Sequence, residues 1–140
     1  MNEFEGVAAR RLAPRYPADL PARLSNAAGD YVIGRLVDLS MHGAALRAAG
    51  SASADGRLRL EVANPEEGWR LAIPADIVAI EADPFGGYVH RLRFRLDHET
   101  AKALARVVTN LRRRFNARQA AIAMERLGPH GARTPRPPAA

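Results

Sequence analysis

Three arginines near the N-terminus have the residue type and spacing to bind a charged ligand. Arg11 and Arg15 form an R-x-x-x-R pattern, and Arg10 stands directly before it. An arginine side chain is a planar fork of N–H donors that matches phosphate oxygens and the acceptor edge of guanine. The pattern alone is weak evidence, because Lys102 is the only lysine among 21 basic residues and arginine pairs at this spacing are common by chance.

A second pattern, D-x-S-x-x-G, is much rarer by chance in this composition. It is formed by Asp38, Ser40 and Gly43 at the end of an apolar run that covers residues 31–39. The structural alternative is an Asp/Ser turn that caps a hairpin. Because this pattern follows the arginine pattern in the chain, the two together favour a ligand site.

Catalysis has little support in the sequence. The four histidines fall in separate predicted elements without metal-ligand spacing: His42, His90, His98 and His130. The order Asp38, Ser40, His42 looks like a catalytic triad, but alternate residues of one short segment cannot converge on a reacting atom. With no cysteine either, we expect neither an enzyme nor a metal site.

Length and charge limit the classes of protein further. The 140 residues fit one compact domain, and the net charge of +6 suggests a polyanion as partner. Residues 1–96 contain 12 basic and 12 acidic groups, so the whole surplus lies in the final third. No apolar run approaches the ~20 residues of a membrane span, and the start does not resemble a signal peptide. A cytoplasmic protein without membrane insertion is the expectation.

Short apolar runs separated by turn residues predict an all-β domain. We expect strands over 20–24, 31–39, 43–46, 57–62, 69–80 and 88–96, with Pro74 marking an edge or a bulge. Strands of this length, with a turn every few residues, indicate a small antiparallel barrel or sandwich.

A long amphipathic helix is predicted over 97–127. Asp97 is a good N-cap, and apolar residues recur with helical spacing through Leu104, Leu111 and Phe115. Gly128 and the proline after it supply a stop. We therefore divide the chain into an N-terminal arm (1–9), a barrel (10–96), this helix and a disordered tail (128–140).

The two motifs, in this order, resemble those of the PilZ domain family, and the likeness extends over most of the chain. The segments from Ala75 to Val78 and from Val89 to Phe94 look like the closing hairpin of the family. The family often has a glycine in the last strand, where this chain has Arg91 and Leu92. The resemblance implies a six-stranded antiparallel β-barrel followed by a C-terminal α-helix.

The resemblance also implies that the chain is a bacterial receptor for cyclic di-GMP. Arg11 and Arg15 would clamp phosphates or the guanine O6 and N7 atoms. Asp38 would accept hydrogen bonds from the guanine N1–H and N2–H₂ groups, and the Ser40 hydroxyl would bind a base or a phosphate. Gly43 would allow a turn and a close approach of the backbone to the ligand.

Further expectations follow for stoichiometry and partners. Arg10 would add a contact that favours a stacked dimer of the ligand. Because no output domain is present, the response would pass through a protein partner or through a homodimer formed by the C-terminal helix. No cofactor is expected besides the ligand.

Two other functions remain open from the sequence. One is a basic small-barrel protein that binds nucleic acid with the helix and tail, for which strand aromatics would have to be exposed. Trp69, Tyr31 and Tyr88 are expected mostly in the core, which weighs against it. The other is a PilZ adaptor that no longer binds nucleotide, and the intact motifs weigh against that.

Overall fold

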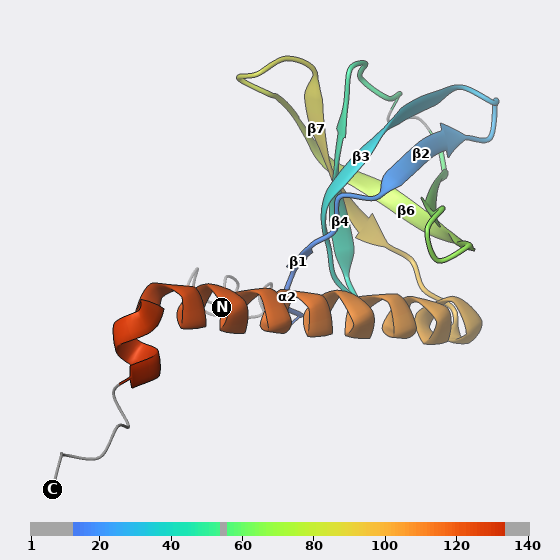
Figure 1. Ribbon diagram of the computed structural model, residues 1–140. Coiled ribbons are helices and arrows are strands. Elements are labelled where there is room, and N and C mark those ends of the chain that lie inside the picture. The colour runs from blue at the N-terminus through green and yellow to red at the C-terminus, as the bar shows by residue number, and fades with distance from the viewer. Residues whose placement is uncertain (1–12, 54–55, 134–140) are drawn as a thin grey trace, which may run out of the picture.

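The fold is a closed antiparallel barrel with one helix across its end (Figure 1). The computed structural model describes residues 13–53 and 56–133, with side chains through residue 128. Its elements are β1 (Tyr16–Pro17), β2 (Pro21–Asn26), β3 (Tyr31–Leu39), β4 (Gly43–Ala48), β5 (Leu58–Asn64), β6 (Trp69–Ala82), β7 (Tyr88–Phe94) and α2 (His98–Arg133). The sheet order is β1-β3-β2-β5-β6-β7-β4, and the β3–β4 pairing closes it. The predicted six-stranded barrel with a C-terminal helix is confirmed, and β1 is a short addition along β3.

The β2–β3 hairpin shows how turn residues set the strand register. The Asn26 side-chain oxygen accepts a hydrogen bond from the Asp30 N–H at 3.0 Å, and the Asn26 N–H donates to the Asp30 carbonyl. Gly29 has a φ of 94°, which a residue with a Cβ rarely adopts. This turn places Ser25 opposite Tyr31 and so fixes which side chains of both strands face the core.

Pro74 lies inside β6 at a point where its missing N–H is not needed. Its carbonyl accepts a hydrogen bond from the Arg95 N–H at 2.8 Å, and Arg95 lies just past the end of β7. The N and C=O groups of one strand residue point to the same side. The proline nitrogen, which carries no N–H, therefore points toward the chain just past the end of β7, where no strand hydrogen bond is lost. β6 is not an edge strand, and its bulge lies between Ile77 and Ala79, so the prediction of an edge or bulge at Pro74 is wrong.

A second bulge, in β3, turns the end of that strand. Leu36 is opposite Leu46 and Asp38 is opposite Ala45, so Val37 is the extra residue. Leu36 and Leu39 both belong to the buried core although they are three positions apart. The bulge makes this possible, and it directs the Asp38 side chain to the outside of the barrel.

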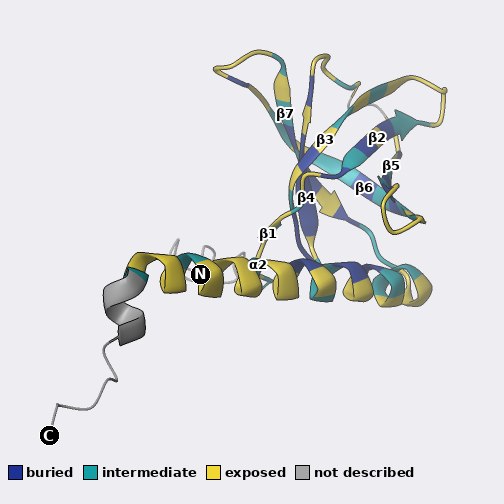
Figure 2. Ribbon diagram, in the orientation of Figure 1, coloured by how far each residue is buried: buried dark blue, intermediate teal, exposed yellow. Residues whose placement is uncertain are grey.

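Helix α2 closes the end of the barrel at which β3 ends. The Asp97 carboxylate accepts a hydrogen bond from the Thr100 N–H at 2.7 Å, which caps the helix as predicted. Leu104, Val107 and Leu111 are buried against the barrel, and the second half of the helix extends past it, mostly exposed (Figure 2). The apolar side chains of its first half thus supply the last part of the core.

The chain ends differ in detail from the predicted division. Gly128 has non-helical angles (φ 60°, ψ −167°) and interrupts the helix at the predicted stop, and a further helical segment follows it to Arg133. The predicted N-terminal arm and the last seven positions of the predicted tail, 134–140, lie outside the described residues. Across the described chain, none of the helical structure combines the length and the hydropathy of a membrane span.

Candidate functional site

Asp38 lies on the outer face of the barrel, at the end of β3. It is opposite Ala45 on β4, and Ala45 is opposite Arg91 on β7. Ala44 and Leu46, on either side of Ala45, belong to the core, so alternation directs Ala45 outward. Residues directly opposite in register share a face, and the carboxylate therefore points away from the core.

The Asp38 carboxylate is desolvated without being fully hydrogen-bonded. Its Oδ1 atom is buried and has no hydrogen-bond partner among the described residues. Burial raises the pKa of Asp38, while the charge of Arg15, the backbone N–H of Ala45 and the charge of Arg91 lower it, in that order. A buried acceptor without a donor is costly, so this oxygen is poised to accept a hydrogen bond from a ligand.

Arg15 approaches Asp38 from the side opposite to Ala45. It stands immediately before β1, whose Pro17 is opposite Asp38. The short β1 ladder thus brings the second arginine of R-x-x-x-R beside the aspartate of D-x-S-x-x-G, and the Arg15 side chain is exposed. Arg10 and Arg11, the other two predicted arginines, lie outside the described residues.

Ser40 holds the turn that follows Asp38. Its hydroxyl donates to the Gly43 carbonyl at 3.2 Å and accepts from the backbone N–H groups of His42 and Gly43, both at 3.1 Å. The residue is 2% exposed. These bonds are those of the hairpin turn named above as the structural alternative, and they position the end of β3.

Gly43 is required because two strands come close together. A Cβ on Gly43 would collide with the carbonyl oxygen of Leu92 on β7. The structural need for glycine is therefore the β4–β7 contact, and Gly43 does not have the positive φ that only glycine adopts readily. Arg93, which is opposite Gly43, is exposed on the same outer face as Arg91.

The described histidines have structural surroundings. His90 is fully buried, with its Nε2 accepting from the Ala52 N–H at 3.0 Å and its Nδ1 lying 3.3 Å from the Leu46 carbonyl. This arrangement requires a neutral ring whose Nδ1–H donates, and burial lowers the pKa of His90. Within the described residues, no three acidic or histidine side chains are grouped to hold a metal ion.

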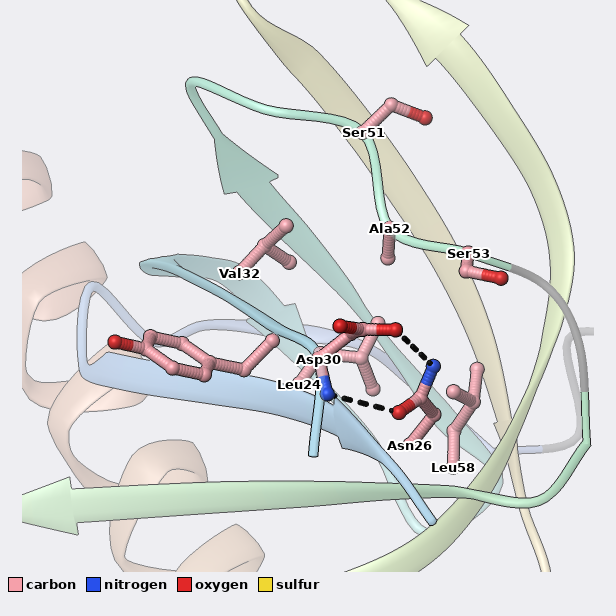
Figure 3. Close-up of a pocket in the computed structure, with 9 residues that line it drawn as sticks. Leu24, Asn26, Asp30, Val32, Ser51, Ala52, Ser53 and Leu58 are labelled. Carbon is pink, nitrogen blue, oxygen red and sulfur yellow. Dashed lines mark hydrogen bonds between the residues drawn. The ribbon is translucent and has the colours of Figure 1, made fainter. Parts of the chain in front are cut away.

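The described residues line several cavities, two of them of about 600 Å³, and one smaller cavity lies between the motifs and α2. A cavity of about 60 Å³ lies at the β2–β3 turn, where Asn26 and Asp30 bond to each other (Figure 3). It has room for water only. A larger cavity of about 320 Å³ lies between Tyr16, Met41 of the D-x-S-x-x-G turn, and Arg112 on α2. The cavity of about 320 Å³ is therefore lined by residues from the arginine motif (Ala13 and Pro14), from the D-x-S-x-x-G turn (Met41) and from α2.

Three aromatic side chains are more exposed than the sequence suggested. Tyr31 is 58%, Tyr88 38% and Phe85 96% exposed, so the expectation that Tyr31 and Tyr88 lie in the core is wrong. Both tyrosines begin their strands, where the pleat directs them outward. The starts of β3 and β7 and the β6–β7 turn, which bear these residues, lie at the end of the barrel away from α2 (Figure 1). The surplus positive charge of the sequence lies on α2 instead.

Sequence reasoning did not single out three residues that the structure places beside the motifs: Arg91, Ala45 and Tyr16. Arg91 was noted only as a departure in the last strand. Its position two strands from Asp38 depends on the register of β3, β4 and β7, including the bulge at Val37. Single-sequence periodicity contains no signal for that register.

Comparison with known proteins agrees with the motifs and the barrel. The PilZ domain family matches residues 9–110. Similar solved structures include the PilZ domain of YcgR from Escherichia coli with c-di-GMP (TM-score 0.61, 22% identity, 80% of this chain and 97% of that chain). Another is the PilZ domain of CeSA from a cellulose-synthesizing bacterium (TM-score 0.57, 28% identity, 70% and 97%).

The K. pneumonia MrkH–c-di-GMP complex is also similar (TM-score 0.61, 18% identity), over 78% of this chain and 55% of that chain. A search of curated proteins found no significant match. The family match covers all the described strands and about the first third of α2, and with them both motifs. The chain belongs to the PilZ domain family.

Proposed function

We propose that this chain is a cytoplasmic receptor for cyclic di-GMP that passes the signal to a protein partner. The observation that carries the proposal is the Asp38 carboxylate, whose buried Oδ1 has no partner among the described residues while Arg15 stands beside it. Two of the similar structures, YcgR and MrkH, contain c-di-GMP. The proposal transfers that ligand to the outer face around Asp38.

The ligand supplies the donors that this face lacks. Guanine presents N1–H and N2–H₂, and Asp38 offers an acceptor that is already desolvated, so bonding there offsets a cost paid in folding. Arg15, with Arg10 and Arg11, supplies charge-assisted bonds to phosphates or to guanine O6 and N7. In a ligand dimer, Arg10 takes the additional contact.

Ser40 and Gly43 complete the proposed site through the turn. The Ser40 hydroxyl already takes part in three hydrogen bonds within the turn, so its main contribution is to fix the backbone after Asp38. Gly43 allows β4 to lie close to β7. It thereby keeps the distance across β4 from Asp38 to Arg91 short. Substituting either residue is expected to weaken binding by displacing Asp38.

The signal has a direct path from the site to α2. Tyr16 follows Arg15 in the chain, and its ring packs on Phe115 with centroids 5.8 Å apart. The cavity between Tyr16, Met41 and Arg112 leaves space for these groups to move. When the ligand draws Arg15 toward Asp38, Tyr16 moves with it and changes the exposed half of α2. That half is the proposed surface for a partner or for a second copy.

The test is a calorimetric titration of cyclic di-GMP. We expect the wild type to bind in the micromolar range or tighter, and an Arg11→Ala/Arg15→Ala variant to lose binding. Arg59→Ala removes an exposed arginine from β5, outside the row of strands that bears the site, and should bind as the wild type does. No binding by the wild type, together with helix-dependent binding of DNA or RNA, would transfer the assignment to nucleic-acid recognition.

A further inference from the structure

Arg91 completes a row of three side chains across the outer face of the barrel. Asp38 is opposite Ala45, and Ala45 is opposite Arg91, so the three residues follow one another across β3, β4 and β7. Arg15 lies at the other end of this row, before β1. The carboxylate is therefore flanked by one arginine on each side, and both lower its pKa.

Ala45, between Asp38 and Arg91 in this row, has a small side chain that is 2% exposed. Neighbouring strands are about 4.8 Å apart, so the backbones of Asp38 and Arg91 are separated by about 10 Å. The structure shows no hydrogen bond between Arg91 and Asp38 and, in the described chain, none from any other side chain to the free Oδ1 of Asp38.

Arg91 is held in its present position by a weak contact. Its Nε donates to the Glu81 carboxylate at 3.0 Å, and the two side chains are 42% and 55% exposed. An ion pair this exposed contributes little to stability. The guanidinium can therefore leave Glu81 for a stronger, bidentate partner.

We propose that Arg91 reads the same guanine base that Asp38 holds, an inference that rests on the proposed function. The N1–H and N2–H₂ groups of that base donate to Asp38. Its O6 and N7 atoms accept two hydrogen bonds from the Arg91 guanidinium, the pairing that arginine makes with guanine. The base then lies between Asp38 and Arg91, and Arg15 remains free to bind a phosphate. Arg91 is thus a specificity residue for guanine over adenine, which has a donor where guanine has O6.

The test compares cyclic di-GMP with cyclic di-AMP by calorimetric titration of the full chain. We expect Arg91→Ala to weaken cyclic di-GMP binding by about 10- to 100-fold, the range of one bidentate base contact. Cyclic di-AMP binding should change by less than about 3-fold, so the preference for guanine shrinks. Arg91→Lys should recover only a small part of the loss, because an ammonium cannot bond two acceptors in a fixed plane.

Two controls separate this contact from general charge and from folding. Arg59→Ala removes the same charge from β5 and should leave both affinities unchanged. Glu81→Gln removes the competing partner of Arg91 and should bind cyclic di-GMP as well as the wild type or better. Thermal unfolding of each variant checks that the barrel is intact.

Several outcomes would overturn the inference while leaving the proposed function in place. They are wild-type binding by Arg91→Ala, equal losses for both ligands, and full rescue by Arg91→Lys, which would mean that only positive charge matters. Failure of the wild type to bind cyclic di-GMP would instead overturn the proposed function, and this inference with it.

Discussion

Two aspartates at opposite ends of the barrel, Asp38 and Asp83, show the difference between a binding residue and a structural one. Asp83 lies in the β6–β7 turn, where its carboxylate accepts from the Phe85 N–H at 2.9 Å and pairs with the Arg47 Nε at 2.6 Å. The backbone bond from Phe85 and the charge of Arg47 hold the pKa of Asp83 below its usual value. The Asp83 Oδ2, like the Asp38 Oδ1, is buried without a hydrogen bond of regular geometry in the described chain, but the ion pair with Arg47 and the bond from Phe85 hold the Asp83 carboxylate in place.

Asp38 also has arginines nearby, but they do not bond to its buried oxygen. Burial raises the pKa of Asp38, whereas hydrogen bonding lowers that of Asp83. The same residue type thus stabilises one hairpin and is left incompletely paired at the other. The difference is that a buried oxygen of Asp83 has an arginine at ion-pair distance, whereas the described residues give Asp38 no ion pair.

Replacing Asp38 should have the largest effect on binding. Asp38→Ala removes the acceptor for the guanine N1–H and N2–H₂ groups, and we expect cyclic di-GMP affinity to fall by on the order of 100-fold. Asp83→Ala, measured on folded protein, should retain near wild-type affinity because it lies at the other end of the barrel. Equal losses in the two variants would show that the difference between the two aspartates is not functional.

The reverse order should hold for stability. Asp83→Ala leaves the Phe85 N–H and the Arg47 guanidinium without their carboxylate, so we expect the melting temperature to fall by several degrees. Asp38→Ala removes no hydrogen bond from a side-chain donor, so it should lower the melting temperature only slightly. Scanning calorimetry on both variants measures this, and a larger drop for Asp38→Ala would contradict the comparison.

His90, like Asp83, is a buried polar residue with a structural role. Both of its ring nitrogens have hydrogen-bond partners. Burial lowers its pKa from the ordinary value of 6.5, so near that pH the unfolded chain binds more protons than the folded one. The stability that neutral His90 contributes is complete above about pH 6.5 and is lost as the pH falls below it. We expect the melting temperature to drop by a few degrees between pH 7.5 and pH 5.5.

The matched variant for this prediction is His90→Gln. It should be less stable than the wild type at pH 7.5, and its melting temperature should change less over the same pH interval. An unchanged slope in His90→Gln would assign the pH dependence to other groups.

The smallest effect concerns the charge of Asp38 in the absence of ligand. The pKa of Asp38 is raised in the folded state, so ionising this carboxyl group lowers the free energy of unfolding. The loss reaches its full size at pH values above the folded-state pKa. Asp38→Asn should therefore melt at the same temperature as the wild type at pH 7 or slightly above it. The difference should vanish as the pH falls toward 3.8, the ordinary value. A clear loss of stability at pH 7 would make Asp38 a structural residue.

Much of the fold could be predicted because local signals agree with it. Alternating apolar residues located the strands, and the Asp97 cap located the start of α2. The bulge at Val37 could not be predicted, because it depends on Leu36 and Leu39 both finding places in the core. Since that bulge helps set which side chains lie beside Asp38, the motif was visible in the sequence and its surroundings were not.

Gly43 shows the same limit at a single position. A glycine in a motif suggests a turn or a ligand approach, yet here the carbonyl of Leu92 excludes a Cβ. The relevant neighbour lies on β7, far along the chain, and only the three-dimensional register brings it close.

Amide chemical shifts measured by NMR during a titration with cyclic di-GMP test the central claim most directly. The account predicts that the signals of Asp38, Ala45 and Arg91 move on binding, and that those of Asp83 and Phe85 stay in place. Shifts confined to the β6–β7 turn or to the exposed half of α2 would contradict a ligand site at Asp38.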